Sequence, residues 1–252
     1  PCIACNRYVK WEALLTRSLM LGADYIATGH YARVLKLENG RYALASSKTA
    51  VKDQSYALYN LTQRQLAHTL MPIGEYEKPE VRAIAAAAGL PVAAKPDSQE
   101  ICFVPDGDYA HFIDESTGER ALPGKFVRAD GTVLGEHKGL THYTVGQRKG
   151  LGIAFGEPMY VIELRPEQNE VVLGTGDEVY AEELLAGDVN WMAVAPPPAG
   201  EILHCRAKIR YNHGGAACRV TVLPDGKIRV AFPTPQRAVT PGQAVEIGRA
   251  HV

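Results

Sequence analysis

The sequence predicts an α/β part followed by two mostly-β parts, and three observations lead to this fold class. Segments typical of strands and helices alternate from the start of the chain to about residue 113. After Thr117-Gly118 the pattern changes to short β-like runs separated by turn pairs. Beyond the proline-rich stretch APPPAG at 195–200 more short strands follow, with Asp225-Gly226 in a hairpin position. We therefore expect a small central mostly-β unit and a C-terminal all-β barrel.

The α/β part contains five recognisable elements. Residues 7–22 carry apolar side chains at helical spacing, and Gly22 ends that helix. ADYIATGHYARV predicts a short buried strand that runs into a loop at Thr28–His30, and RYALASS predicts another strand. Residues 53–70 predict a helix after a polar turn. KPEVRAIAAAAGL predicts a further helix, with Pro79 in its first turn and Gly89 beyond its end.

The two β parts are predicted from short runs rich in β-branched and aromatic residues. In the central part these runs are KFVRA, YVIEL and EVVLG. In the C-terminal part they are IRYNH, CRVTVL, IRVAF and AVEIG.

Composition places the chain among globular proteins. Apolar residues make up 46% of the 252 residues and charged residues 22%. No run approaches the ~18–20 apolar residues of a membrane helix and no charged-then-apolar leader is present, so we expect a cytoplasmic protein without a membrane partner. The five cysteines are an odd number, which argues against a secreted disulfide framework. A start at Pro1 predicts a fragment whose upstream sequence is missing.

Charge is unevenly distributed along the chain. Residues 120–150 hold six basic and two acidic side chains, and residues 201–252 hold eight basic and three acidic ones. Between them, residues 151–200 hold nine acidic side chains and one basic side chain. The two basic stretches are either a split footprint for a polyanion or ordinary surface charge.

PCIACNRYVKW at the start of the chain raises the question of what Cys2 and Cys5 do. They are a disulfide, two ligands of a metal site, or half of a reactive centre. Zinc usually takes four ligands and no second Cys-x-x-Cys follows. Cys205 and Cys218 lie on predicted strands and are expected to be buried apolar side chains.

Cys102 lies in PDSQEICFVPDGDY, between Ile101 and Phe103. Taken alone, a cysteine in that position is a core residue. The polar flanks favour a different interpretation, in which a brief buried strand surfaces at a polar loop and exposes a reactive thiol.

Three polar segments are candidates for ligand contacts, each with a structural alternative. Thr28–His30 follows a buried strand, where α/β sheets bind ligands and where glycine permits close approach, although a single histidine is often structural. Lys52–Tyr56 offers side chains for phosphates and base edges, or is merely a helix cap. HKGLTHYTVGQRKGLGI is glycine-rich and basic, which suits a phosphate backbone or a solvated hairpin.

With these segments in this order, the chain resembles the tRNA-specific 2-thiouridylases, which convert the wobble uridine of certain tRNAs to 2-thiouridine. The matching segments are PCIACNRYVKW, ATGHYAR, KDQSYALYNL, DSQEICFVPDGDYAHFI, HKGLTHYTVGQRKGLGI, IRYNH and TPGQAV. They extend over nearly the whole chain.

The resemblance implies three domains. Residues 1–114 would be the remainder of a Rossmann-like PP-loop ATP pyrophosphatase domain, residues 115–180 a central tRNA-contacting domain, and residues 181–252 a C-terminal β-barrel. The ATP loop of the family is expected upstream of Pro1, so this PP-loop domain is incomplete. Mg-ATP is the implied co-substrate.

The resemblance also assigns roles to individual residues. Cys5 matches the catalytic cysteine of the first motif and Cys102 the cysteine that carries a persulfide. Gly29 matches a nucleotide-contacting glycine. The implied tRNA-binding residues are Pro1 and Cys2, which face the target base, together with His30, Lys52, Asp53, Gln54, Arg210, Tyr211 and Gln243.

Cys2 departs from the family pattern, because many members have aspartate at this position. A general-base role there is therefore in doubt. The three thiols Cys2, Cys5 and Cys102 would also suit three irons of a [4Fe-4S] cluster, with one iron open to sulfide. The persulfide route and the cluster route are both retained as hypotheses.

The resemblance implies ATP-dependent sulfur transfer, with tRNA and a sulfur-donor protein (a cysteine desulfurase or a sulfur-relay protein) as partners. Two rivals remain. One is a non-catalytic RNA-binding module with a structural metal. The other is another PP-loop enzyme, such as a 4-thiouridine synthase or an amidotransferase-type ligase.

Overall fold

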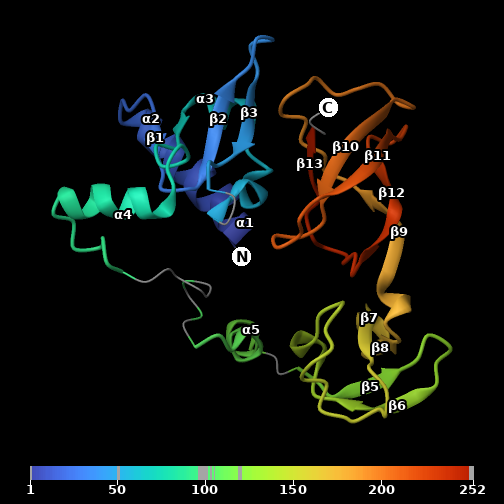
Figure 1. Ribbon diagram of the computed structural model, residues 1–252. Helices are drawn as coiled ribbons and strands as arrows, with labels where there is room; N and C mark the ends of the chain where they lie inside the picture. The colour runs from blue at the N-terminus through green and yellow to red at the C-terminus, as the bar shows by residue number, and fades with distance from the viewer. Residues whose placement is uncertain are drawn as a thin grey trace.

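The computed structural model describes residues 2–49, 52–95, 102, 104, 106–118 and 121–249. Figure 1 shows an α/β part, a C-terminal sheet beside it and a middle sheet at one end of the molecule. Each of the three has its own cluster of buried apolar side chains. The predicted order, an α/β part and then two mostly-β parts, is confirmed. Among the helices described, none is long and apolar enough to cross a membrane.

The chain starts with one continuous helical segment in three sections. They are α1 (Cys2–Ala4), the π-helical η1 (Cys5–Leu14) and α2 (Leu15–Met20). Trp11 and Leu15 on its inner face are 1% and 2% exposed and belong to the core of the α/β part. Gly22, with φ of +88°, follows its end. The predicted helix over 7–22 is confirmed, although it begins earlier.

Four short strands complete the sheet structure of the α/β part. β1 (Ile26–Ala27) pairs in parallel with β4 (Thr69–Leu70), and β2 (Ala32–Lys36) forms an antiparallel hairpin with β3 (Tyr42–Ser46). The predicted strand running into a loop is confirmed, because residues 28–30 follow the carboxyl end of β1 without regular structure.

The predicted helix over 53–70 is wrong. The segment contains η3 (Ser55–Leu58), α3 (Gln63–Ala67) and then β4. Thr62 starts α3 as a separate helix, because its hydroxyl accepts the Gln65 amide at 3.3 Å while the Gln65 side chain accepts the Thr62 amide at 2.9 Å. Leu58 and Leu61 are both fully buried, and the chain turns between the two helices to bury them.

Two helices flank the segment that carries Cys102. α4 (Lys78–Ala87) confirms the prediction from KPEVRAIAAAAGL. α5 (Tyr109–Thr117) starts at Asp108, whose carboxylate accepts the His111 amide at 3.0 Å, and ends at Gly118 in the left-handed conformation. α5 spans the predicted domain boundary at 114/115.

The middle sheet has the order β6-β5-β8-β7. Its strands are β5 (Gly124–Val127), β6 (Val133–His137), β7 (Tyr160–Arg165) and β8 (Glu170–Gly174). The predicted strands KFVRA, YVIEL and EVVLG are confirmed, and β6 was not predicted. Phe126, Val161 and Val171 are fully buried at its centre. Short 3-10 turns lie at Leu140–His142, Pro166–Gln168 and Asp177–Val179.

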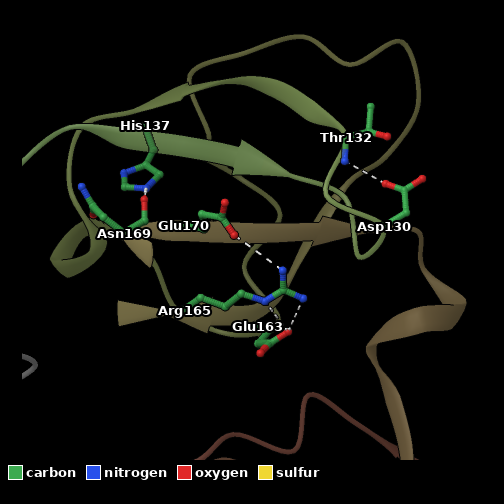
Figure 2. A network of polar contacts seen from close by, with 7 residues as sticks. All are labelled: Asp130, Thr132, His137, Glu163, Arg165, Asn169 and Glu170. Carbon is green, nitrogen blue, oxygen red and sulfur yellow. Dashed lines mark hydrogen bonds and ion pairs between the residues drawn. The ribbon is translucent and has the colours of Figure 1, made fainter. Parts of the chain in front are cut away.

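His137, in the glycine-rich motif, is a structural residue (Figure 2). It is 2% exposed and its Nδ1 accepts the Gly139 amide at 3.0 Å. The ring proton therefore lies on Nε2, which donates to the Asn169 carbonyl at 3.1 Å. Burial lowers the pKa of His137. Nearby, the Arg165 guanidinium at the end of β7 pairs with Glu163 on the same strand and with Glu170 on β8, which links the two strands.

The C-terminal sheet has the order β13-β10-β11-β12-β9. Its strands are β9 (Tyr180–Ala186), β10 (Ile202–Lys208), β11 (Ala216–Val222), β12 (Ile228–Arg237) and β13 (Glu246–Arg249). The hairpin at Asp225-Gly226 is confirmed. Within the described residues no pairing joins β13 to β9, so the five strands form an open sheet there.

The predicted strand IRYNH is wrong, because β10 ends at Lys208 and residues 209–213 form a turn. The His213 amide donates to the Arg210 carbonyl at 3.0 Å, and Gly215, with φ of +78°, returns the chain into β11. The Arg210 guanidinium donates to the Arg237 carbonyl at 3.0 Å. Arg210 and Tyr211 are therefore presented on a turn and not on a strand.

The connection after β9 attaches the C-terminal sheet to the α/β part. Arg41 donates to the carbonyl oxygens of Trp191 and Met192, the latter at 2.9 Å. The Asn190 amide donates to the carbonyl oxygens of Tyr59 and Leu61, both at 2.9 Å. These bonds fix the two parts side by side, as Figure 1 shows.

Candidate active site and RNA-contacting surface

Cys2 and Cys5 lie at the start of the first helical segment. Cys2 is exposed and Cys5 is half-buried. The helix that carries them is fixed to the rest of the α/β part by two buried side chains. The Asn6 amide donates to the Ala57 carbonyl at 3.0 Å, and the Trp11 indole donates to the Thr69 hydroxyl at 2.8 Å. The two thiols therefore sit on a rigid element with solvent access.

Cys102 lies on the connection between α4 and α5 and is exposed. It adopts a turn conformation, so the expected brief buried strand is wrong at Cys102; Ile101 and Phe103 lie outside the described residues. Val104 is 2% exposed and anchors the chain two residues later. The thiol is thus presented on an exposed turn next to a buried anchor.

The structure does not join the three thiols to one another. No disulfide is formed by any of the five cysteines. Among the described residues, no group of three or more His, Cys, Asp or Glu side chains is placed to hold a metal ion. Cys2, Cys5 and Cys102 therefore do not fit a [4Fe-4S] cluster in this arrangement.

Gly29 and His30 follow the carboxyl end of β1. Gly29 is exposed, and a Cβ added there would meet only the tip of Ile73, at 4.0 Å. His30 is half-buried against Trp11, with ring centroids 5.4 Å apart. A ligand can therefore approach the backbone at Gly29, while the His30 ring is held in place.

His30 is neutral at physiological pH. Burial, and secondarily the Lys10 ammonium, lower its pKa to about 4. Lys10 Nζ lies 3.4 Å from Nε2, and an ammonium can only donate, so the ring proton lies on Nδ1 and is donated to the Thr28 hydroxyl at 3.0 Å. With both ring nitrogens engaged and the ring neutral, His30 could offer a ligand its ring surface, and it cannot act as a cation toward phosphate.

Asp53 and Gln54 make contacts within the protein. The Asp53 side chain is 6% exposed; its carboxylate accepts the Ser47 amide at 2.9 Å and the Ser55 hydroxyl at 2.7 Å. The Gln54 side chain accepts the Tyr31 amide at 2.9 Å, and the Gln54 amide donates to the Tyr31 carbonyl at 2.8 Å. These bonds hold the segment after Lys52 against the loop that carries His30.

Tyr211 brings the C-terminal sheet into contact with this region. Its ring packs edge-on against Tyr56, with centroids 6.2 Å apart, and the side chain is 49% exposed. Burial raises the pKa of Tyr211; Asp53 and Cys2 raise it further and Lys52 lowers it, so all three lie within electrostatic reach of the phenol. Residues predicted from both ends of the chain therefore share one surface.

The remaining predicted residues are not joined to this surface by contacts. Gln243 is exposed, and its backbone amide donates to the Thr240 carbonyl at 3.2 Å. In the part of the chain that the structure describes, no hydrogen bond or ion pair links the side chains of Cys102 or Gln243 to it. Pro1 lies outside the described residues.

Two residues at this surface were missed by the sequence predictions. Lys208 lies 3.6 Å from the Asp53 carboxylate, and Glu246 is opposite Lys208 on the neighbouring strand. Lys208 immediately precedes the IRYNH motif, which is the one signal that pointed to it. Nothing in the local sequence distinguishes Glu246.

Three family models match successive parts of the chain. A tRNA methyl transferase HUP domain matches residues 1–106. A tRNA methyl transferase PRC-barrel domain matches residues 110–175, and an aminomethyltransferase β-barrel domain matches residues 181–247.

Relatives of high identity cover nearly the whole chain. The tRNA-specific 2-thiouridylase MnmA of Lachnoclostridium phytofermentans is 63% identical over 97% of this chain and 68% of its own length. The protein of the same name from Acetivibrio thermocellus is 56% identical over 97% of this chain and 68% of its own length. The protein of the same name from Carboxydothermus hydrogenoformans is 51% identical over 97% of this chain and 67% of its own length.

Proposed function

The chain belongs to the tRNA-specific 2-thiouridylase family, and on that premise we propose that it transfers sulfur to C2 of the wobble uridine of tRNA through a persulfide on Cys102. The family activity is that of a tRNA sulfurtransferase. The roles of individual residues given below are part of the proposal.

The exposure of the two thiols carries this proposal. Cys102 is exposed on a turn and Cys5 is half-buried at a helix start, so neither is a core side chain. Burial in two separate apolar cores would have prevented sulfur exchange between them. Cys218 shows the contrast, because it is 5% exposed in the C-terminal core and burial raises its pKa to about 11.

ATP supplies the leaving group in this chemistry. The C2 oxygen of uracil leaves poorly, and adenylation converts it into part of AMP, which leaves readily. The open approach to the backbone at Gly29, beyond the carboxyl end of β1, supports a nucleotide contact there.

Sulfur transfer then proceeds by two exchanges at the cysteines. The terminal sulfur of the Cys102 persulfide attacks C2, AMP departs, and the base is joined to Cys102 through two sulfurs. The Cys5 thiolate attacks the Cys102 sulfur and breaks the S–S bond, so the electron pair goes to the sulfur that stays on the base. The products are 2-thiouridine and a Cys5–Cys102 disulfide, which a thiol must reduce before the next turnover.

The target base would lie at the surface formed by Cys2, Lys52 and Tyr211. The wobble base must leave its stack to reach the thiols, and contacts to both halves of the protein offset that cost. We propose that His30, Lys52, Gln54, Arg210 and Gln243 contact the tRNA around it, with Pro1 next to Cys2 at the base. Asp53, whose side chain is 6% exposed, would support tRNA binding from within the Lys52–Gln54 segment. Support comes from the shared electrostatic environment of Tyr211, Cys2 and Lys52.

The division into domains and the partners are also proposals. Three separate apolar clusters support domains at 1–114, 115–180 and 181–252. A cysteine desulfurase or a sulfur-relay protein would load Cys102, whose exposure permits the transfer. An activity on tRNA with such a donor would be cytoplasmic.

The iron–sulfur alternative rests on the presence of a third thiol, Cys2, and is less well supported. The three thiols are not gathered as a ligand set among the described residues. Iron and sulfide counting on anaerobically purified protein distinguishes the routes, because the persulfide route predicts full activity without iron.

The proposed function is tested by substitution of the thiols. Cys5→Ser and Cys102→Ser, introduced at the gene's own locus, are expected to abolish 2-thiouridine in tRNA without loss of the folded protein. Nucleoside analysis of total tRNA by mass spectrometry measures the result. An RNA-binding module with a structural metal predicts instead that Cys5→Ser reduces folding and metal content together.

Cys205→Ser is the matched control, because Cys205 lies on β10, outside the proposed site, and should leave 2-thiouridine unchanged. Wild-type levels of 2-thiouridine in the Cys102→Ser strain would refute the persulfide route. If the gene affected another thiolated nucleoside, such as 4-thiouridine, the alternative PP-loop activity would be correct.

A further inference from the structure

Asp53 lies between the α/β part and the C-terminal sheet. Its carboxylate accepts the Ser47 amide and the Ser55 hydroxyl from its own part of the chain. It also lies 3.6 Å from Lys208 Nζ, at the end of β10. With a side chain only 6% exposed, Asp53 offers RNA almost no surface.

Lys208 and Glu246 face Asp53 from the opposite side. They are direct partners in the antiparallel pairing of β10 with β13, so their side chains project from the same face of the sheet. The Lys208 side chain is 29% exposed, and its ammonium pairs with Asp53 and also favours the charged form of the Glu246 carboxylate.

Glu246 adds a second, largely buried carboxylate to the surroundings of the Lys208 ammonium. Its Oε2 is buried and has no hydrogen-bond partner. Burial raises the pKa of Glu246 and Asp53 raises it further, whereas Ser55 and Lys208 favour the charged form. Lys208 therefore pairs with Asp53 and favours the charged form of Glu246, and its removal takes this ammonium away from both carboxylates.

The junction lies directly beside the RNA-contacting surface. Tyr211 follows Lys208 by three residues, on the turn that leaves β10. The Tyr56 hydroxyl, three residues after Asp53, donates to the Ala244 carbonyl at 2.7 Å, two residues before Glu246. A shift at the junction would therefore move Tyr211 relative to Cys2 and Lys52.

We propose that Asp53 and Lys208, with Glu246 beside them, form a clasp that positions the 209–213 turn against the first helix, so that the two halves of the chain present one tRNA-binding surface. Asp53 and Lys208 are then positioning residues and not RNA contacts. The inference rests on the proposed function, because it concerns how the proposed tRNA surface is assembled.

A double-mutant cycle with Asp53→Asn and Lys208→Met tests the clasp through tRNA affinity. Asparagine keeps an acceptor for the Ser47 amide, and methionine keeps most of the length of the lysine side chain. We expect each single variant to weaken tRNA binding by about tenfold, and the double variant to bind no more weakly than either single variant.

Two further variants serve as controls. Lys208→Arg keeps the positive charge and should restore most of the affinity. Lys227→Met removes one exposed charge, which pairs with Asp225 in the β11–β12 hairpin of the same sheet, and should change the affinity little.

Hydrogen exchange separates failure of the clasp from failure of the proposed function, because it needs no RNA. Lys208→Met should accelerate exchange in peptides covering 47–56 and 208–213, including the Ser47 amide. Unchanged exchange would overturn the clasp even if tRNA binds. The clasp is also refuted if Asp53→Asn binds tRNA normally while Lys208→Met does not, because Lys208 would then contact RNA directly.

Discussion

The His30 ring illustrates how local packing determines what a residue can contribute. A histidine in a segment predicted to contact tRNA suggests a cation for phosphate, but the ring is half-buried between Trp11 and the Lys10 ammonium. With its pKa lowered to about 4, it stays neutral wherever the enzyme works. The structure thus gives a neutral ring with a fixed tautomer, and under the proposed function this ring would suit a base more than the phosphate backbone.

The lowered pKa of His30 predicts a specific pH dependence of stability. The unfolded chain binds a proton on this residue below 6.5, whereas the folded protein resists protonation until about 4. Above pH 6.5 the neutral His30 therefore leaves the free energy of unfolding at its full value. As the pH falls from 6.5 to about 4, the unfolded chain gains a proton that the folded protein does not, and the free energy of unfolding decreases. After allowance for partial solvent screening, the loss is about 1–2 kcal/mol.

His30→Gln should reduce the loss of unfolding free energy between pH 6.5 and pH 4 by about 1–2 kcal/mol. Urea unfolding at these two pH values measures the difference. His111→Gln is the control, because its side chain is 60% exposed and pairs with Glu115 on α5. A His30→Gln variant with the pH profile of the wild type would show that His30 is not the group responsible.

At the level of single residues, motifs indicate candidate reactive groups but cannot predict the residues that support them. Cys5 and Cys102 are chemically distinctive and lie in recognisable segments. Lys208 and Glu246 become partners only through the register of β10 with β13, and reach Asp53 only when two parts of the chain pack together. A local sequence pattern cannot predict a contact between residues as far apart in the chain as Asp53 and Lys208.

At the level of elements, the first helical segment is the platform for Cys2 and Cys5. Its orientation depends on Trp11, which is 1% exposed and donates its indole proton to Thr69. The Thr69 hydroxyl in turn donates to the Gln65 carbonyl at 2.6 Å, so one hydroxyl links the helix to α3 and β4.

Thr69→Val should destabilise the protein by about 1–3 kcal/mol, because the valine leaves the buried indole N–H without an acceptor. Urea unfolding measures this change, and Thr69→Ser, which keeps the hydroxyl, should cost clearly less. Equal stability of the valine and serine variants would mean that the Trp11 bond does not fix the helix.

The elements that were predicted correctly have periodic patterns with clear ends. The first helix and α4 have apolar spacing and a terminal glycine, and β5, β7 and β8 are short β-rich runs. The prediction of one helix over 53–70 was wrong because the capping box at Thr62 starts a separate helix. The prediction of a strand at IRYNH was wrong because the chain turns there and returns through Gly215. In both cases local turn chemistry prevailed over the apolar pattern.

At the scale of the whole molecule, the fold brings distant segments of the chain to one surface. The connection after β9 docks on the α/β part through Arg41 and Asn190, and Asp53 and Lys208 form an ion pair between the same two parts. Cys2 and Tyr211 are thereby brought within electrostatic reach of each other. On the proposed function, sulfur transfer and RNA recognition would both depend on this packing of the two parts.

The most direct test of this account is to trap the sulfur on its way to the base. If Cys102 delivers the persulfide and Cys5 completes the transfer, Cys5→Ser stops the reaction with tRNA joined to Cys102 through a disulfide. Non-reducing gels of the variant, purified from cells that express it at its own locus, should show a protein–tRNA adduct that dithiothreitol releases. The adduct should be absent from Cys5→Ser/Cys102→Ser. Normal 2-thiouridine in the Cys5→Ser strain, with no adduct, would contradict the transfer of sulfur between these two thiols.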